Sequence, residues 1–213
     1  MVNLINLIYP NTCGICDKIS NSSICKKCEL MINDILKCKV EYYKDKNFTK
    51  HFYLFDYKGV VREKIINYKF NDKPYLYRTF LEIILKNKKI HDFLKKYDII
   101  IPVPIHKKRK RFRGYNQSEL IAKNIAKNIE NLEFKKDCLI KLKNNQMQST
   151  LKSSERKQNV VGVYQVKNKE KLKGKKLLLF DDIFTTGSTV NECCNILKKA
   201  EIEKIDIFTL AKD

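Results

Sequence analysis

A short apolar run that ends in two acids and a hydroxyl-rich turn is the feature that most constrains how this chain of 213 residues folds. The run covers residues 176–180, and after it come Asp181 and Asp182 and then the turn Thr185, Thr186, Gly187, Ser188 and Thr189. Because the run is too short and too uniformly apolar for an amphipathic helix, we predict a buried parallel strand that ends at Asp181. Apolar residues recur at helical spacing from Val190 onward. The turn is therefore expected to join a strand to a helix.

The composition of this turn favours an anion-binding site. Backbone N–H groups in the first turn of a helix have no partner within the helix, and they attract negative charge. Gly187 lets the backbone approach a ligand closely, the neighbouring hydroxyls add donors, and the two carboxylates suit a pair of sugar hydroxyls. An ordinary strand-to-helix turn with an acidic cap is the alternative, although capping needs fewer polar residues. The segment fits neither the P-loop nor the dinucleotide pattern. It resembles the phosphoribosyl pyrophosphate (PRPP) signature of type I phosphoribosyltransferases.

The rest of the chain alternates between strand and helix patterns. We predict strands at 52–57, 98–101, 138–142, 163–166, 176–180 and 204–210, and helices at 59–70, 74–87 and 115–129. Such alternation indicates an α/β fold, a parallel sheet flanked by helices with ligands at the carboxyl ends of its strands. We place a domain boundary after residue 48, between an amino-terminal module with its connector (1–48) and the phosphoribosyltransferase-like domain (49–213).

Two Cys-x-x-Cys turns mark the amino-terminal module. They contain Cys13, Cys16, Cys25 and Cys28. Four thiolates in paired turns suit a tetrahedral zinc ion, and no ligand position is left open for catalysis, so we predict a structural zinc site. A redox motif or two disulfides are the alternatives, but redox motifs occur singly and disulfides are rare in the cytosol.

The formal net charge of +20 raises the question of nucleic-acid binding. Most of the lysines are expected to form a solvated surface, so placement says more than the total. One loop after the strand at 98–101 concentrates basic, aromatic and polar residues, which are His106, Lys107, Lys108, Arg109, Arg111, Phe112, Arg113, Tyr115 and Asn116. This loop suits pyrophosphate or, by charge and stacking together, single-stranded nucleic acid; a solvated charge run is the third interpretation.

A further polar segment follows at 148–159, where Gln148, Arg156 and Asn159 predict a mobile loop or an ordinary surface connector. Together with the paired cysteines, the Val-Pro-Ile-His and Arg-Gly-Tyr-Asn-Gln stretches and the Asp-Asp turn, this segment resembles the ComF family of competence-associated proteins over nearly the whole chain. Lys143 and Asn145 depart from the Arg and Thr that the family tends to carry before the Gln.

The resemblance implies a factor that supports uptake of single-stranded DNA in natural transformation, beside a helicase-like competence protein and an inner-membrane DNA channel. It implies binding of PRPP with Mg²⁺ at Asp181, Asp182 and the turn that follows them. Two classes of function stay open: a competence factor that binds PRPP, a nucleotide or DNA, and an active transferase that moves phosphoribose from PRPP to a nitrogenous acceptor with Asp181 and Asp182 as catalytic residues. No apolar stretch approaches the ~20 residues of a membrane span, and no export signal is evident at the start, so we expect a cytoplasmic protein without membrane insertion.

Overall fold

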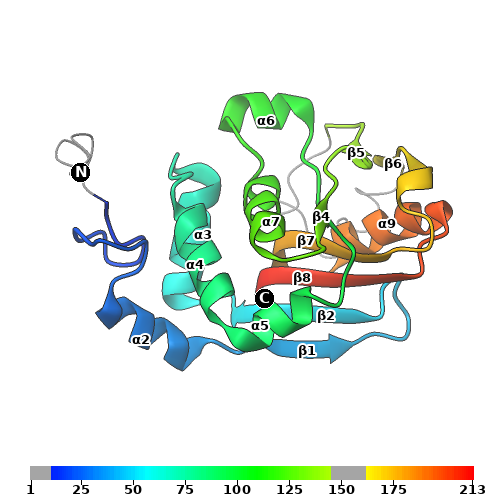
Figure 1. Ribbon diagram of the computed structural model, residues 1–213. Coiled ribbons are helices and arrows are strands. Elements are labelled where there is room, and N and C mark those ends of the chain that lie inside the picture. Colours follow the sequence, from blue (N-terminus) through cyan, green and yellow to red (C-terminus); the bar gives the residue numbers. More distant parts are fainter. Residues whose placement is uncertain (1–10, 145–161) are drawn as a thin grey trace.

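A central sheet with helices on both faces forms the body of the protein (Figure 1). The computed structural model describes residues 11–144 and 162–213. The strand order is β1-β2-β8-β7-β3-β4, and every pairing is parallel except that of β1 with β2. These strands are β1 (Lys39–Tyr42), β2 (Lys50–Asp56), β3 (Ile99–Pro102), β4 (Glu133–Phe134), β7 (Lys176–Phe184) and β8 (Lys204–Lys212). The predicted α/β class, with a mainly parallel sheet, is confirmed.

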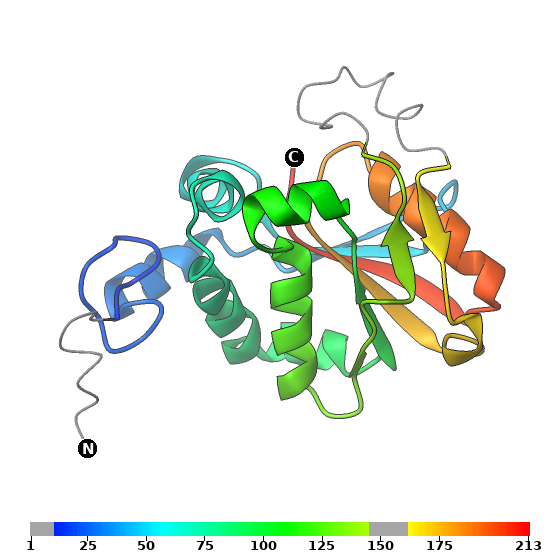
Figure 2. The same ribbon diagram turned by 90° about the horizontal axis from the view of Figure 1, so that it is seen from above.

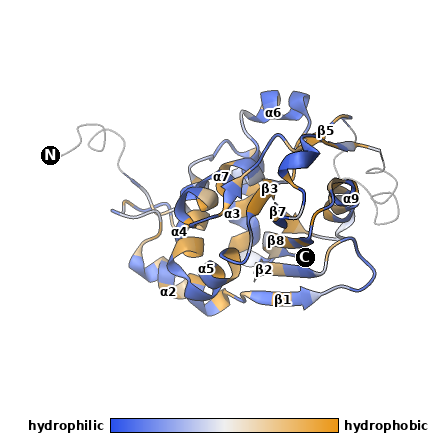
Figure 3. Cartoon of the chain, turned by 45° about the vertical axis from the view of Figure 1, so that its right-hand side comes forward, coloured by the Kyte–Doolittle hydropathy of each residue, from blue (hydrophilic) through white to orange (hydrophobic). Residues whose placement is uncertain are grey.

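Two apolar cores lie on opposite faces of this sheet because neighbouring residues of a strand point to opposite sides. Along β7, Leu178 and Phe180 join one core, and Leu177 and Leu179 join the other. The first core is covered by α3 (Gly59–Phe70), α4 (Leu76–Lys86), α5 (Lys88–Leu94) and α7 (Gln117–Asn128), and the second by α9 (Ser188–Leu197). The hydrophilic colour of α6 (Lys107–Arg113) in Figure 3 contrasts with these covering helices, and none of its side chains is buried.

Two of the predicted strands do not join the main sheet. β5 (Leu139–Lys141) and β6 (Tyr164–Val166) pair antiparallel in a separate two-stranded sheet, which Figure 2 shows beside α9. The expectation that they extend the parallel sheet is therefore wrong. A parallel partner requires a crossover of a dozen or more residues that packs on the sheet, whereas these two short strands pair with each other and leave the sheet edge to β4.

Two boundaries also differ from the sequence-based expectation. β7 continues past Asp181 to Phe184, because β8 runs beside it as far as Lys212 and supplies partners for the last residues. The basic segment, predicted as a loop, forms the short helix α6. Its N-cap is His106, whose Nδ1 accepts a hydrogen bond from the backbone N–H of Lys108 at 3.2 Å. Lysine and arginine are good helix formers, so a charged surface segment of this composition is stable as a helix.

The amino-terminal cysteine module rests on α4. The Thr79 hydroxyl donates to the carbonyl oxygen of Ser23, and the Ser23 N–H donates to Glu82, both at 2.9 Å. A side chain at Gly14 would lie 2.1 Å from Oγ1 of Thr79, so the module approaches α4 too closely for any larger residue. From the module, α2 (Lys26–Ile35) leads to β1, which joins the main sheet. The boundary after residue 48 stays a prediction. Among the described helices, none has the length and apolar character required to cross a membrane.

Candidate anion and metal sites

A cavity of about 370 Å³ lies where β2, β3 and β7 end. Its walls come from the last residues of β7, from the segments that follow these strands, and from α3, α6, α7, α9, β5 and β6. The polar and charged residues that line it are Tyr57, Arg62, Lys69, Arg109, Asn116, Gln117, Ser118, Lys141, Tyr164, Asp181, Asp182, Thr185, Ser188, Thr189 and Asp213. The volume lies in the range of ligand sites, roughly 300–1,000 Å³, and the position agrees with the general rule for open parallel sheets.

The two acids occupy different surroundings within this cavity. Asp182 is buried and forms an ion pair with Lys69 at 2.8 Å. Asp181 accepts hydrogen bonds from the Ser118 hydroxyl and from the backbone N–H of Asp182, both at 3.0 Å. Burial, assisted by the charge of Asp182, raises the pKa of Asp181 to about 7, although Lys69 and these hydrogen bonds act in the opposite direction. One carboxylate is thus paired with a cation, and its neighbour titrates near neutrality.

The turn after β7 presents hydroxyl and backbone donors to the same cavity. Thr185, Gly187, Ser188 and Thr189 line it, and the Thr186 hydroxyl lies 2.8 Å from that of Ser188. Gly187 has a φ of 73° and directly precedes α9. The Ser188 N–H donates to the Thr186 hydroxyl at 3.3 Å, and the first-turn N–H groups of Thr189 and Val190, which have no partner within the helix, border the region of the two acids. The predicted strand–turn–helix unit and its junction at Gly187 are present as the sequence indicated.

A stack of rings supports this turn from below. A side chain at Gly187 would lie 2.5 Å from Cζ of Phe184, so the turn rests directly on that ring. The buried His51 ring stacks on Phe184, with the two ring centroids 4.2 Å apart. Since the Thr209 hydroxyl donates to the Ala211 carbonyl oxygen at 3.2 Å, its oxygen accepts from Nε2–H of His51 at 2.8 Å.

This hydrogen bond selects the neutral tautomer of His51. The other nitrogen, Nδ1, is buried and has no hydrogen-bond partner in the described part of the chain. Charging the ring would place a second N–H there without an acceptor, and burial lowers the pKa of His51 to about 3. The imidazole therefore acts as a neutral, flat support for Phe184 throughout the physiological pH range.

The residues predicted for the basic loop are divided between the cavity and the solvent. Arg109 and Asn116 line the cavity, and Asn116 also caps α7 by accepting from the Ser118 N–H at 3.1 Å. Lys107, Lys108, Arg111 and Phe112 are exposed, Phe112 to 94%. Two others serve the scaffold. The Arg113 guanidinium lies over the Phe70 ring and donates to Gln117 at 2.7 Å, and the Tyr115 hydroxyl donates to the backbone of Tyr68.

Several cavity residues escaped the sequence analysis. Lys69 and Ser118 contact the acids, and Lys141 lies with its ammonium 5.5 Å from the centre of the buried Tyr164 ring. Burial, with the nearby charge of Arg109, lowers the pKa of Lys141 to about 8. A lysine has no distinctive signal in a chain this rich in lysine, but Ser118 directly follows the Arg-Gly-Tyr-Asn-Gln stretch and belongs to the same helix start. The predicted loop residues Gln148, Arg156 and Asn159 lie outside the described residues.

The four predicted cysteines converge as a candidate metal centre. The sulfurs of Cys13, Cys16, Cys25 and Cys28 all lie within 4.8 Å of one another, and those of Cys16 and Cys25 are 3.8 Å apart. A tetrahedral ion with bonds of about 2.3 Å to sulfur would hold thiolates about 3.8 Å apart, so this set fits such an ion. Burial opposes ionisation of Cys13, but backbone N–H groups around its sulfur outweigh it and lower the pKa to about 7. Ionisation of Cys13 is thus eased, whereas burial and the neighbouring cysteines raise the pKa of Cys28.

A family model matches the carboxyl-terminal part of the chain. Residues 116–213 match the family model described as "Phosphoribosyl transferase domain". This match includes both acids and the turn after β7, so the carboxyl-terminal part of the chain is similar to a phosphoribosyltransferase domain, with its candidate cavity at the expected edge of the sheet. A purine phosphoribosyltransferase from Pyrococcus horikoshii Ot3 superposes with a TM-score of 0.41 at 13% identity, over 66% of this chain and 85% of that one. A likeness this low adds nothing to the family match.

Curated relatives extend the similarity to the amino-terminal module. The chain is 26% identical to "Competence protein F" of Haemophilus influenzae, over 91% of this chain and 92% of that protein. It is 25% identical to "Competence protein ComFC" of Bacillus subtilis, over 96% of this chain and 79% of the relative. "DNA utilization protein YhgH" of Escherichia coli is 24% identical over 54% of this chain and 49% of its own length. The resemblance to the ComF family that the motifs predicted is confirmed.

Proposed function

We propose that this protein is a ComF-like competence factor, which supports the uptake of single-stranded DNA and binds PRPP, accompanied by Mg²⁺, in the cavity at the end of β7. The names of its relatives support the competence role, and the phosphoribosyltransferase domain supports the ligand class. A cytoplasmic location beside a helicase-like competence protein and an inner-membrane DNA channel belongs to the same proposal. The four-cysteine module would hold a structural zinc ion.

The observation that carries the ligand assignment is the meeting of paired carboxylates and a helix-start turn in one cavity. Asp181 and Asp182 would accept hydrogen bonds from neighbouring ribose hydroxyls, and the turn of residues 185–189 would hold a 5′-phosphate. Lys69, Arg109 and Lys141 would offset the remaining negative charge of the ligand. An ordinary cap of α9 would need none of these cations in the same space.

Calorimetry with PRPP and Mg²⁺ tests this assignment. The variant Asp181→Asn with Asp182→Asn should bind more weakly by several kcal/mol, since each charge-assisted hydrogen bond contributes about 1.5–3 kcal/mol. A matched control removes the exposed carboxylates of Asp34 and Asp92, both remote in sequence from the cavity. Unchanged affinity in the first variant, or equal losses in both, would place the ligand elsewhere.

The exposed face of α6 supports the DNA part of the proposal. Lys107, Lys108 and Arg111 carry charge into solvent beside the exposed Phe112 ring, a combination suited to phosphate contacts and base stacking. Tyr115 is engaged with Tyr68, so stacking there is assigned to Phe112 alone. Replacing Lys107, Lys108 and Arg111 with Gln should flatten the log–log salt dependence of oligothymidylate binding by roughly 2, at ~0.7 per phosphate. An unchanged slope would remove α6 from the DNA-binding surface.

An active transferase is the second candidate, and the pKa values of two groups in the cavity favour it. Asp181, with a pKa of about 7, and Lys141, with a pKa of about 8, lie in one cavity, and groups that titrate near neutrality suit proton transfer. In this reaction a nitrogen acceptor would form a bond to C1 of the ribose as the bond to pyrophosphate breaks, and the nitrogen's proton would pass to a base. Incubation with PRPP, Mg²⁺ and a panel of nucleobases decides between the candidates. Pyrophosphate release that depends on the base would establish the transferase.

A further inference from the structure

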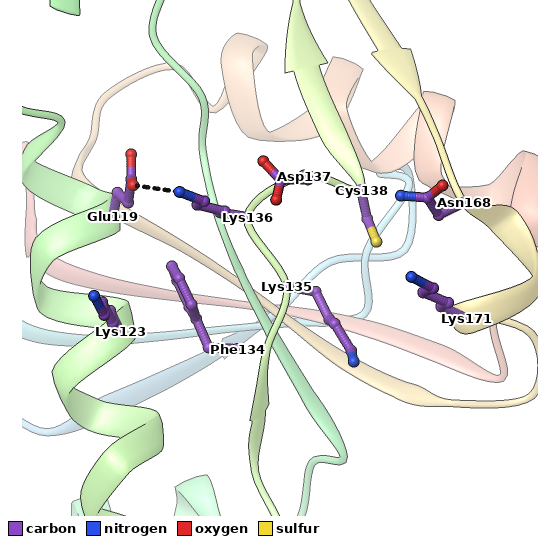
Figure 4. Close-up of a pocket in the computed structure, with 9 residues that line it drawn as sticks. All are labelled: Glu119, Lys123, Phe134, Lys135, Lys136, Asp137, Cys138, Asn168 and Lys171. Carbon is purple, nitrogen blue, oxygen red and sulfur yellow. Dashed lines mark ion pairs between the residues drawn. The ribbon is translucent and has the colours of Figure 1, made fainter.

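A second cavity, separate from the first, lies between α7 and the short 3₁₀ helix η2 (Lys169–Lys171) (Figure 4). It encloses about 320 Å³ and shares no lining residue with the cavity at the end of β7. Its lining is Glu119, Lys123, Phe134, Lys135, Lys136, Asp137, Cys138, Asn168 and Lys171. Three separate parts of the chain, α7, the segment after β4 and η2, thus bring four lysines to one hollow.

Two carboxylates, Glu119 and Asp137, line this hollow with the four lysines, so its positive charge is only partly neutralised. Lys136 lies 3.7 Å from Glu119, and Lys135 pairs with Glu133. Lys123 and Lys171, on opposite walls, are exposed and form no ion pair within the described residues. The nearby Lys173, in contrast, pairs with Glu201 at 2.7 Å. Concave surfaces concentrate the field of like charges, so this hollow attracts anions more strongly than an even layer of surface lysines does.

Phe134 gives the hollow an aromatic surface as well as charge. Its ring is only partly buried, and Figure 4 shows it between Lys123 and Lys135. Asn168 stands on the wall of Lys171 with an amide that donates and accepts hydrogen bonds. An aromatic face flanked by cations suits a nucleotide unit, whose base stacks on a ring while its phosphate meets ammonium groups.

A chain of ion pairs connects this hollow to α6. Glu119 lies 2.7 Å from Lys110 of α6 and 3.7 Å from Lys136 at the hollow. Glu119, which lies between the two basic surfaces, is therefore neutralised from both sides, and it presents no barrier to a polyanion that passes over it. The exposed Phe112 lies at one end of this path and Phe134 at the other.

We infer that the hollow between α7 and η2, with Lys123, Lys171 and Phe134, is a second contact site for a single strand of nucleic acid that also lies on α6. The inference rests on the proposed DNA handling and extends it, because it assigns a path for the strand away from the PRPP cavity. The strand would contact α6 first, cross the neutralised Glu119 and place one nucleotide in the hollow.

Fluorescence anisotropy of labelled oligothymidylates with the full protein tests this path. The variant Lys123→Gln with Lys171→Gln removes two phosphate contacts, so the log–log salt slope should flatten by roughly 1.4, which is about a 25-fold loss of affinity at 0.1 M salt. The control Lys88→Gln with Lys89→Gln removes two exposed lysines that line a different cavity, beside α2, and should change both quantities little. Oligomers too short to leave α6 should not distinguish the two variants.

Each outcome decides the point. Equal losses of affinity in the two double variants would mean that net charge alone determines binding. An unchanged salt slope in the variant Lys123→Gln with Lys171→Gln would mean that the strand does not enter the hollow. Either result overturns the inference but leaves DNA binding itself intact. An unmodified protein that binds no oligothymidylate would overturn the DNA part of the proposed function as well. Displacement of the oligomer by polyglutamate of equal charge would assign the hollow to an acidic protein instead.

Discussion

Replacement of Gly187 by Ala tests whether the turn of residues 185–189 requires a residue without a side chain at this position. Two costs add at this position. The residue has a φ of 73°, and the left-handed region costs a residue with a side chain about 1–2 kcal/mol. The new methyl carbon would also lie 2.5 Å from Cζ of Phe184, and such overpacking costs roughly 1–3 kcal/mol. We expect Gly187→Ala to reduce the free energy of unfolding by about 2–5 kcal/mol.

Gly174 provides a matched control for the backbone part of this cost. Its φ is 67°, but a side chain there would meet nothing within 4 Å. Gly174→Ala should therefore cost only about 1–2 kcal/mol, and the gain from restricting the unfolded chain is the same in both variants and cancels. Urea unfolding of the zinc-loaded protein measures the difference, expected at roughly 1–3 kcal/mol. The turn of residues 185–189, which is the proposed phosphate site, should also lose affinity for PRPP in the Gly187 variant only.

The clash with Phe184 has its own test. Phe184→Leu removes the ring that the added methyl group meets, so the double variant with Gly187→Ala should be less destabilised than the sum of the two single changes. Strict additivity, or a Gly187 variant no less stable than the Gly174 variant, would show that the turn does not depend on close contact with the ring. The reasoning about the stacked support would then fail.

Three further predictions concern the metal, the acids and the ring stack. Elemental analysis should find one zinc ion per chain, and the double variant Cys13→Ser with Cys28→Ser should release it and unfold the module. Structural zinc sites of this type contribute ~10 kcal/mol or more to folding. A folded protein without metal would contradict this prediction. Because the pKa of Asp181 is raised to about 7, its contribution to stability is present below the unfolded pKa of about 4 and is lost as pH rises through 7. Thermal unfolding of Asp181→Asn should therefore show a stability that changes less between pH 4 and 7 than that of the unmodified protein. Asp45→Asn is the control. Position 51 should tolerate Phe but not Ala, because Phe184 requires a flat ring beside it. Calorimetry should show that PRPP affinity is retained in His51→Phe and reduced at least tenfold in His51→Ala. Similar affinities in the two variants would refute the positioning role of the ring.

Local pattern was sufficient for the elements whose neighbours are close in sequence. The strand that contains Asp181, the turn at Gly187 and the helix from Ser188 follow one another directly. Each has its own signal in the sequence: an apolar run, a glycine or helical spacing. The same is true of the four cysteines, because two short turns bring their sulfurs together whatever the rest of the chain does. Helix α3 also has the predicted bounds of 59–70.

Contacts between distant segments decided what the pattern left open. The strand of Asp181 extends to Phe184 because β8, more than twenty residues later, continues beside it, and no feature within the strand records its partner. The pairing of β5 with β6 was likewise decided by which strand edges were available. The different environments of Asp181 and Asp182 come from Ser118 and Lys69, on helices far away in the sequence.

The physical reason is the distance over which the interactions behind each feature act. Backbone propensity, glycine conformation and ligand spacing act over a few residues, so the sequence by itself determined the turn, the cysteine set and the alternation of strand and helix. Burial and electrostatic interaction depend on distance in space, so only the tertiary structure decided that Lys69 meets Asp182, that His51 supports Phe184 and that lysines from three elements converge beside α7.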